Sequence, residues 1–309
     1  MYPARFIFNK IKRRLPLTRA EHRFLWLCQY CYHDAAPGDI PDPTHDRYHC
    51  YVCIYGPQRS ELLRTDPSTS AFLPDLQLKQ WKESDAAYKG RFVELIVQSG
   101  DRVHVVVLVI KSDRQEALFG PLRSRQYPTV PCQYYHERVD GSGSTICVFP
   151  DLFFEGVAPD GSAIRVQAEM KRKAYFSVLL RAELFSYVHE FFRSTIPAFQ
   201  KEMFLGTVII DDLISGDALV PHGIQRPKYA VLDAICRNMY PGPDLLIPTN
   251  CDRTKPMTNG EFLADNLAGM CKVALSTRNH PWLESITIMR KAKQIRMITL
   301  DDFGRITSF

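Results

Sequence analysis

The sequence predicts an α/β protein in which helices flank a mixed sheet, with an α+β arrangement as the alternative. Val103–Ile110 is an almost unbroken apolar run rich in β-branched residues, which is typical of a central strand covered on both faces. A second apolar run, 205–210, ends directly at two aspartates. Segments with helical spacing of apolar residues alternate with these runs, and this alternation is the pattern of α/β layer folds.

Capping and turn residues divide the chain into further elements. Thr18 followed by Glu21 forms a capping box, which predicts a helix over 18–32, and the Pro- and Asp-rich stretch 34–46 is predicted as a loop. The other predicted helices are 86–98, 174–195, 228–239 and 259–275. The predicted strands are 48–55, 103–110, 144–154, 163–169, 205–210 and 245–247. The last segment, 286–309, is predicted as a strand followed by a tail.

Composition and length indicate a folded chain of ordinary type. Of 309 residues, 45% are hydrophobic and 24% charged, which excludes disordered and fibrous classes. No apolar stretch is long enough to cross a bilayer, and the first residues lack the pattern of a secretory signal, so we expect a cytoplasmic protein without a membrane partner. We divide the chain into a basic N-terminal segment, 1–57, and an α/β domain, 58–309.

The charge balance indicates a polyanionic partner. The net charge is +5, and basic residues crowd the beginning of the chain. Lys12, Arg13 and Arg14 are therefore candidates for salt-dependent contacts with nucleic-acid phosphates. The alternative is that these residues form a solvated terminal face.

Four of the nine cysteines form two CxxC pairs. Cys28 and Cys31, then Cys50 and Cys53, have the spacing of a structural zinc site. The alternative is buried free thiols, because residues 50 and 53 of a strand point to opposite faces.

Carboxylates at the ends of apolar strands are candidates for a catalytic metal centre. Asp211 and Asp212 end the 205–210 strand, and Asp252 follows the strand 245–247. Asp265 stands among apolar residues of the helix 259–275, where an unpaired carboxylate is costly to bury. Such oxygen ligands suit Mg²⁺ or Mn²⁺, with Asp211 and Asp265 as the principal metal ligands. The alternatives are turn residues for Asp211 and Asp212, and an exposed helix position for Asp265.

Three motifs resemble the domain-of-unknown-function 3800 family, which is regarded as ribonuclease-H-like. They are Val208-Ile-Ile-Asp211-Asp212, Cys251-Asp252-Arg253-Thr254-Lys255, and Gly260-Glu-Phe-Leu-Ala-Asp265-Asn-Leu-Ala-Gly269. The resemblance implies a ribonuclease-H-like sheet preceded by the basic, CxxC-bearing extension. The family's first strand carries Asp-Glu-Ser-Gly-Asp, whereas 48–56, its expected counterpart here, contains no carboxylate.

Two functions follow from these observations. The first is a metal-dependent nuclease that hydrolyses RNA or DNA, with Lys111 and Lys255 contacting phosphate and the four aspartates 211, 212, 252 and 265 in catalysis. The second is a catalytically degenerate nucleic-acid-binding or interaction subunit of a larger complex. Bacterial defence against mobile elements is the biological setting that would suit such a family.

Overall fold

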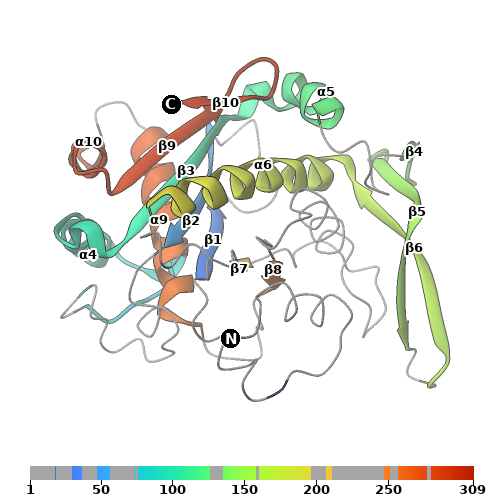
Figure 1. Cartoon of the computed structure of the whole chain (residues 1–309), viewed down its shortest axis with the longest axis horizontal. Coiled ribbons are helices and arrows are strands. Elements are labelled where there is room, and N and C mark those ends of the chain that lie inside the picture. The colour runs from blue at the N-terminus through green and yellow to red at the C-terminus, as the bar shows by residue number, and fades with distance from the viewer. Residues whose placement is uncertain are drawn as a thin grey trace.

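The computed structural model describes residues 18, 30–36, 47–55, 73, 76–125, 135–157, 160–195, 207–210, 247–250, 257–276 and 280–309. Its central feature is a mixed sheet of seven strands in the order β10-β9-β3-β2-β1-β7-β8 (Figure 1). The strands are β1 (Tyr30–Ala36), β2 (Tyr48–Tyr55), β3 (His104–Lys111), β7 (Thr207–Ile210), β8 (Ile247–Asn250), β9 (Ile295–Leu300) and β10 (Ile306–Ser308).

Strand directions bring five strand ends to one edge of this sheet. β1, β2 and β3 are antiparallel neighbours, so β1 and β3 run the same way. β7 is parallel to β1, β8 is parallel to β7, and β9 is parallel to β3. The C-terminal ends of β1, β3, β7, β8 and β9 therefore share one edge, which we call the carboxyl edge. In open α/β sheets, ligands bind outside this edge.

One face of the sheet is covered by α4 (Ala86–Gln98), α9 (Asn259–Ser276) and α10 (Trp282–Lys291). Alternate residues of β2 and β3 point into this apolar layer, among them Cys50, Val52 and Val107. Burying one such aliphatic side chain contributes about 2 kcal/mol, so this layer is a principal source of stability.

The opposite face is covered by α6 (Arg172–Thr195), which crosses the sheet in Figure 1. The guanidinium of Arg181 lies 5.4 Å from the centre of the Tyr51 ring on β2. Residues of β3 that alternate with the first set, such as Val106 and Leu108, are fully buried as well. β3 is thus covered on both sides, which confirms the predicted central strand and the α/β class.

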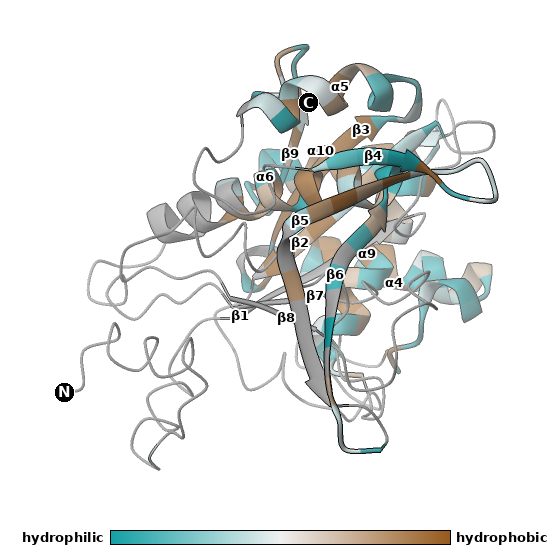
Figure 2. Ribbon diagram, turned by 90° about the vertical axis from the view of Figure 1, so that its right-hand side faces the viewer, coloured by the Kyte–Doolittle hydropathy of each residue, from teal (hydrophilic) through white to brown (hydrophobic). Residues whose placement is uncertain are grey.

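A second sheet contains β4 (His136–Val139), β5 (Thr145–Val157) and β6 (Ala163–Lys171). β5 and β6 pair as a long antiparallel hairpin, which lies to one side of the large sheet in Figure 1 and faces the viewer in Figure 2. β6 leads directly into α6, and α5 (Gln115–Arg125) follows β3 after one 3-10 turn. These connections bring α5, the hairpin and the start of α6 together.

Most predicted elements are confirmed, and two are wrong. Tyr30–Tyr32, predicted as the end of a helix, and 34–36, predicted as loop, belong to β1, because pairing with β2 and β7 outweighs local preference. The final segment contains helix α10 before its strands, which the sequence analysis did not predict. The predicted helix 228–239 lies outside the described residues.

The predicted domain boundary at residue 57 can be placed relative to the sheet. It falls between β2 and β3, which are hydrogen-bonded neighbours in the sheet. The described part of the N-terminal segment is therefore integral to the α/β layer, since β1 and β2 are central strands. Among the described residues, no helix has the length and apolar character needed to cross a bilayer.

Candidate functional site

Two of the strands that precede predicted acidic residues, β7 and β8, end at the carboxyl edge. His33 of β1 pairs with Ile210 of β7, and Ile210 pairs with Asn250 of β8. Asp211 follows Ile210 in the sequence, and Asp252 follows Asn250 by two positions. The structure does not describe Asp211, Asp212 or Asp252 themselves.

β1 supplies an acidic residue that the sequence analysis missed. Asp34 directly follows His33, and its backbone pairs with Val52 of β2. The residue was overlooked because a helix was expected at 18–32 and a loop beyond it. Alternate aromatic residues at Tyr30 and Tyr32, followed by Asp34 and then Pro37, are the strand-and-turn signal that indicates β1.

Asp265 has a clear structural partner. Its Oδ2 accepts a hydrogen bond of 2.7 Å from the backbone N–H of Trp81, at the start of a short 3-10 helix. Gly269, one turn further along α9, faces the same residue, since a Cβ at Gly269 would lie 2.2 Å from Cδ1 of the Trp81 ring. Asp265 and Gly269 of the motif in α9 therefore hold Trp81 against the helix.

Neighbouring polar groups fix the same segment. The side-chain amide of Asn266 donates to the carbonyl oxygen of Lys79 at 2.8 Å, and the Tyr88 hydroxyl accepts from the Lys79 N–H at 3.0 Å. Burial raises the pKa of Tyr88, which keeps the hydroxyl neutral. The predicted metal ligand Asp265 thus belongs to a set of side chains that anchor residues 79–81.

The structure describes one of the five predicted phosphate-binding residues. Lys111 is exposed at the end of β3, and so lies on the carboxyl edge. Lys255, Lys12, Arg13 and Arg14 fall on segments that the structure leaves undescribed.

Of the predicted four-cysteine zinc site, Cys50 and Cys53 are the pair whose side chains the structure describes. Cys50 and Cys53 are both fully buried on β2 and, three residues apart, point to opposite faces of the sheet, so one ion cannot bind both. Burial raises the pKa of the Cys50 thiol well above its usual value, which favours a free thiol. Cys31 is opposite Tyr55 in the sheet, and Cys28 lies outside the description. Within the described ranges, no three His, Cys, Asp or Glu residues gather as a metal site.

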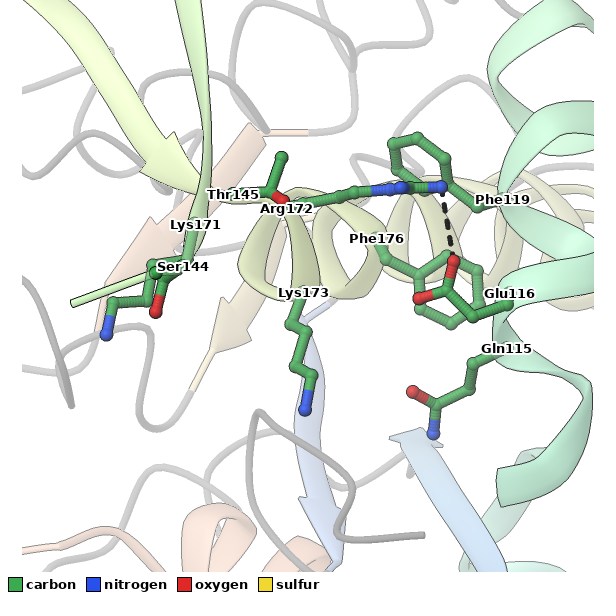
Figure 3. Close-up of a pocket in the computed structure, with 10 residues that line it drawn as sticks. Gln115, Glu116, Phe119, Ser144, Thr145, Lys171, Arg172, Lys173 and Phe176 are labelled. Atoms are coloured by element: carbon green, nitrogen blue, oxygen red, sulfur yellow. Dashed lines mark ion pairs between the residues drawn. The ribbon is translucent and has the colours of Figure 1, made fainter. Parts of the chain in front are cut away.

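A pocket of about 500 Å³ lies where α5, the β4–β5 turn and the β6–α6 junction meet (Figure 3). We call it the junction pocket. Its lining combines polar, basic and aromatic side chains: Gln115, Glu116, Phe119, Gly143, Ser144, Thr145, Lys171, Arg172, Lys173 and Phe176. The volume is within the usual range for small-molecule sites.

Three consecutive cations, Lys171, Arg172 and Lys173, mark the junction pocket. Arg172 is held in place, with an ion pair of 3.2 Å to Glu116 and its guanidinium 4.5 Å from the centre of the Phe119 ring. Lys173 instead extends into the open space between the two walls of the pocket (Figure 3). The lining therefore carries three positive charges and one negative charge.

Two hydrogen-bond donors of residues that line the junction pocket have no acceptor among the described residues. Nε2 of Gln115 and Nε of Arg172 are buried without a hydrogen-bond acceptor among the described residues. Nε of Arg172 forms an ion pair of 3.8 Å with Glu137 Oε1, a distance too long for a hydrogen bond. An anion with several acceptor oxygens would satisfy such donors.

One local feature of the sequence points to the junction pocket. Lys171-Arg172-Lys173 leads into α6, and the first turn of that helix contains no acidic residue. Helix N-termini favour the reverse charge pattern, because the helix dipole is positive there. A basic run at this position is therefore the feature that pointed to an anion.

A comparison with protein-family models, curated proteins and solved structures found nothing that matches this chain.

Proposed function

We propose that the protein is a divalent-metal-dependent nuclease that hydrolyses phosphodiester bonds in RNA or DNA on a ribonuclease-H-like sheet. One observation carries the proposal. β1, β7 and β8 are adjacent parallel strands whose register aligns His33, Ile210 and Asn250. In the sequence, Asp34, Asp211 and Asp252 follow these three positions by one or two residues.

The strand order supports the ribonuclease-H-like plan. The first three strands form an antiparallel meander, and the later strands β7 and β8 add in parallel beside β1. The family's first strand carries acidic residues, and the segment 48–56 contains none. In our proposal β1 corresponds to that first strand, and Asp34 supplies the carboxylate. β1 contains this one carboxylate and not the family's full Asp-Glu-Ser-Gly-Asp motif.

The spacing of the strands suits a shared cation. Neighbouring strands lie about 4.8 Å apart, so acidic residues that follow aligned positions on three adjacent strands are within reach of a common site. Carboxylate oxygens are the ligands that Mg²⁺ and Mn²⁺ prefer, and in nucleases these ions activate water and stabilise the leaving oxygen. Lys111 on the same edge is suited to hold a phosphate of the substrate.

The test is cleavage of labelled single-stranded RNA, single-stranded DNA and an RNA–DNA hybrid with Mg²⁺, Mn²⁺ or EDTA. We expect cleavage only with a divalent ion, and a loss of about 100-fold or more in Asp34→Asn and Asp211→Asn, because each change removes a charged metal ligand. Glu284→Gln, which alters an exposed carboxylate on α10, is the matched control. Cleavage that persists in EDTA, or in both aspartate variants, would exclude the proposed centre.

Asp265 is tested separately because Trp81 already binds one of its oxygens. Asn at this position keeps an oxygen that can accept from the Trp81 N–H, whereas Ala does not. We expect Asp265→Asn to cleave within about threefold of the wild-type rate, and Asp265→Ala to lose about 1 kcal/mol of stability. A loss of activity in Asp265→Asn with unchanged stability would instead place Asp265 among the metal ligands.

The second candidate is a nucleic-acid-binding subunit without hydrolytic activity. The basic lining of the junction pocket favours it, because this site needs no metal to bind a polyanion. Salt-sensitive binding of an oligonucleotide, with no cleavage under any divalent ion, would distinguish this candidate from the nuclease.

A further inference from the structure

We propose that the junction pocket binds a phosphate group and that this phosphate belongs to a nucleic-acid backbone. The phosphate site stands on the geometry of the pocket alone, while the nucleic-acid source rests on the proposed function.

The electrostatics of the pocket favour an anion. Glu116 is neutralised by Arg172 at 3.2 Å, and among the described residues Lys173 makes no ion pair. The Lys171-Arg172-Lys173 run lies at the start of α6, where the helix dipole already places partial positive charge. This arrangement is unfavourable for the empty protein, and a bound anion would relieve it.

The hydrogen-bonding groups favour an oxyanion with several oxygens. Gln115 Nε2 and Arg172 Nε are buried donors without an acceptor in the described structure. They come from different elements, since Gln115 begins α5 and Arg172 begins α6. The first backbone N–H groups of α6 have no partner within the helix either. Phosphate oxygens accept from all three kinds of donor.

The size and place of the pocket favour a phosphodiester over a free ion. A volume of about 500 Å³ is far larger than one phosphate group requires and leaves room for the attached sugar. Gln115 is separated from Lys111, the last residue of β3, by a single 3-10 turn. The α5 wall of the pocket therefore begins close to the end of β3, which belongs to the carboxyl edge.

Binding of fluorescein-labelled single-stranded RNA and DNA is measured by anisotropy in EDTA over a range of salt concentrations. We expect Lys173→Gln to weaken binding about fivefold and to lower the slope of log Kd against log salt by about one, as for loss of one phosphate contact. Lys171→Gln is expected to act in the same direction. Lys291→Gln, which removes an exposed charge on α10, is the control and should bind as wild type does. Circular dichroism and thermal unfolding verify that each variant is folded.

Inorganic phosphate and a nucleoside monophosphate are then added as competitors and titrated alone by NMR. Weakened oligonucleotide binding in the pocket variants, with free phosphate a poor competitor, supports the backbone phosphate. Tight binding of the small phosphates, with oligonucleotide affinity unchanged in Lys173→Gln, overturns the nucleic-acid source. No effect of either lysine variant on any phosphate ligand overturns the pocket itself.

These outcomes are separate from those of the nuclease test. EDTA prevents metal-dependent cleavage, so binding by the pocket is measured whether or not the protein is an enzyme. If Lys173→Gln weakens oligonucleotide binding but no cleavage is seen, the pocket proposal stands and the nuclease proposal fails. If the wild-type protein cleaves and the Lys173→Gln variant binds the oligonucleotide as tightly as the wild type does, the nuclease proposal stands and the pocket proposal fails.

Discussion

The two faces of the large sheet use polar side chains in different ways. On the face covered by α9, Asp265 and Asn266 bind backbone groups of residues 79–81, inside a layer that is otherwise apolar. On the face covered by α6, the ionisable side chains of His49 and Arg181 are buried. This helix begins at the junction pocket, where two buried donors have no acceptor among the described residues. A buried polar side chain whose hydrogen bonds are made to the backbone has a structural role. Buried donors that have no acceptor, and that lie beside an excess of positive charge, indicate that a ligand binds there.

The largest expected effect is on the α9 face, at Gly269. In Gly269→Ala the new Cβ would lie 2.2 Å from Trp81 Cδ1, so the ring must move out of its contacts with Phe92 and Trp282. We expect a loss of about 3 kcal/mol in the free energy of unfolding, measured with urea.

Gly90→Ala on α4 is the matched control, because apart from the adjacent residues and backbone of its own helix no described atom lies within 4 Å of the added Cβ. This change is expected to stabilise the protein by about 0.5 kcal/mol through helix propensity. Equal effects of the two substitutions would contradict close packing of Trp81 on α9.

The next effect is on the α6 face, where His49 is buried and its Nδ1 lies 3.2 Å from the Tyr51 hydroxyl. Burial, with Arg181 and Lys272 nearby, lowers the pKa of His49 from 6.5 to about 3. As pH falls below 6.5 the unfolded chain takes up a proton that the folded protein does not, so stability is lost between about pH 6.5 and pH 3. The expected loss is about 2 kcal/mol between pH 7 and pH 5.

His49→Gln keeps a polar group beside Tyr51 and does not titrate in this range. Urea unfolding at both pH values should therefore show a smaller loss in the variant than in the wild type. An identical dependence on pH in the two proteins would show that His49 is not held neutral in the fold.

The smallest effect concerns the stability of α6 itself. Lys173→Glu places a negative charge in the first turn of the helix, and we expect about 0.5 kcal/mol of added stability at low salt, together with weaker binding of phosphate. The opposite change in free energy is expected for Lys291→Glu, which reverses a favourable charge in the last turn of α10. Urea unfolding at low and high salt measures both. A less stable Lys173→Glu would mean that the lysine supports the fold rather than a ligand.

The local sequence pattern is sufficient to predict the buried apolar strands, but it is not sufficient to predict β1, a strand that depends on pairing with other strands. Val103–Ile110 was recognisable because a β-branched run has few alternatives to a covered strand. β1 was not, because a capping box favoured helix, and only pairing with β2 and β7 makes residues 30–36 extended.

The candidate sites were less predictable, since their partners are distant in the chain. The apolar surroundings of Asp265 were visible in the sequence, but Trp81, which binds its carboxylate, is 184 residues away. The two walls of the junction pocket come from α5 and α6, which are separated in the sequence by the strands β4, β5 and β6. No short stretch of sequence therefore contains both walls.

The position of β9 ties completion of the sheet to the last part of the chain. The Thr299 hydroxyl donates to the carbonyl oxygen of Val109 across 190 residues, and β9 occupies the side of β3 that β2 leaves open. Contacts between such distant residues slow folding, because a long loop must close before they form. During synthesis, β3 therefore exposes an unpaired valine-rich edge until residues 295–300 leave the ribosome. Such an edge is a template for aggregation, so a nascent chain of this protein is expected to depend on chaperones more than a chain with local pairing.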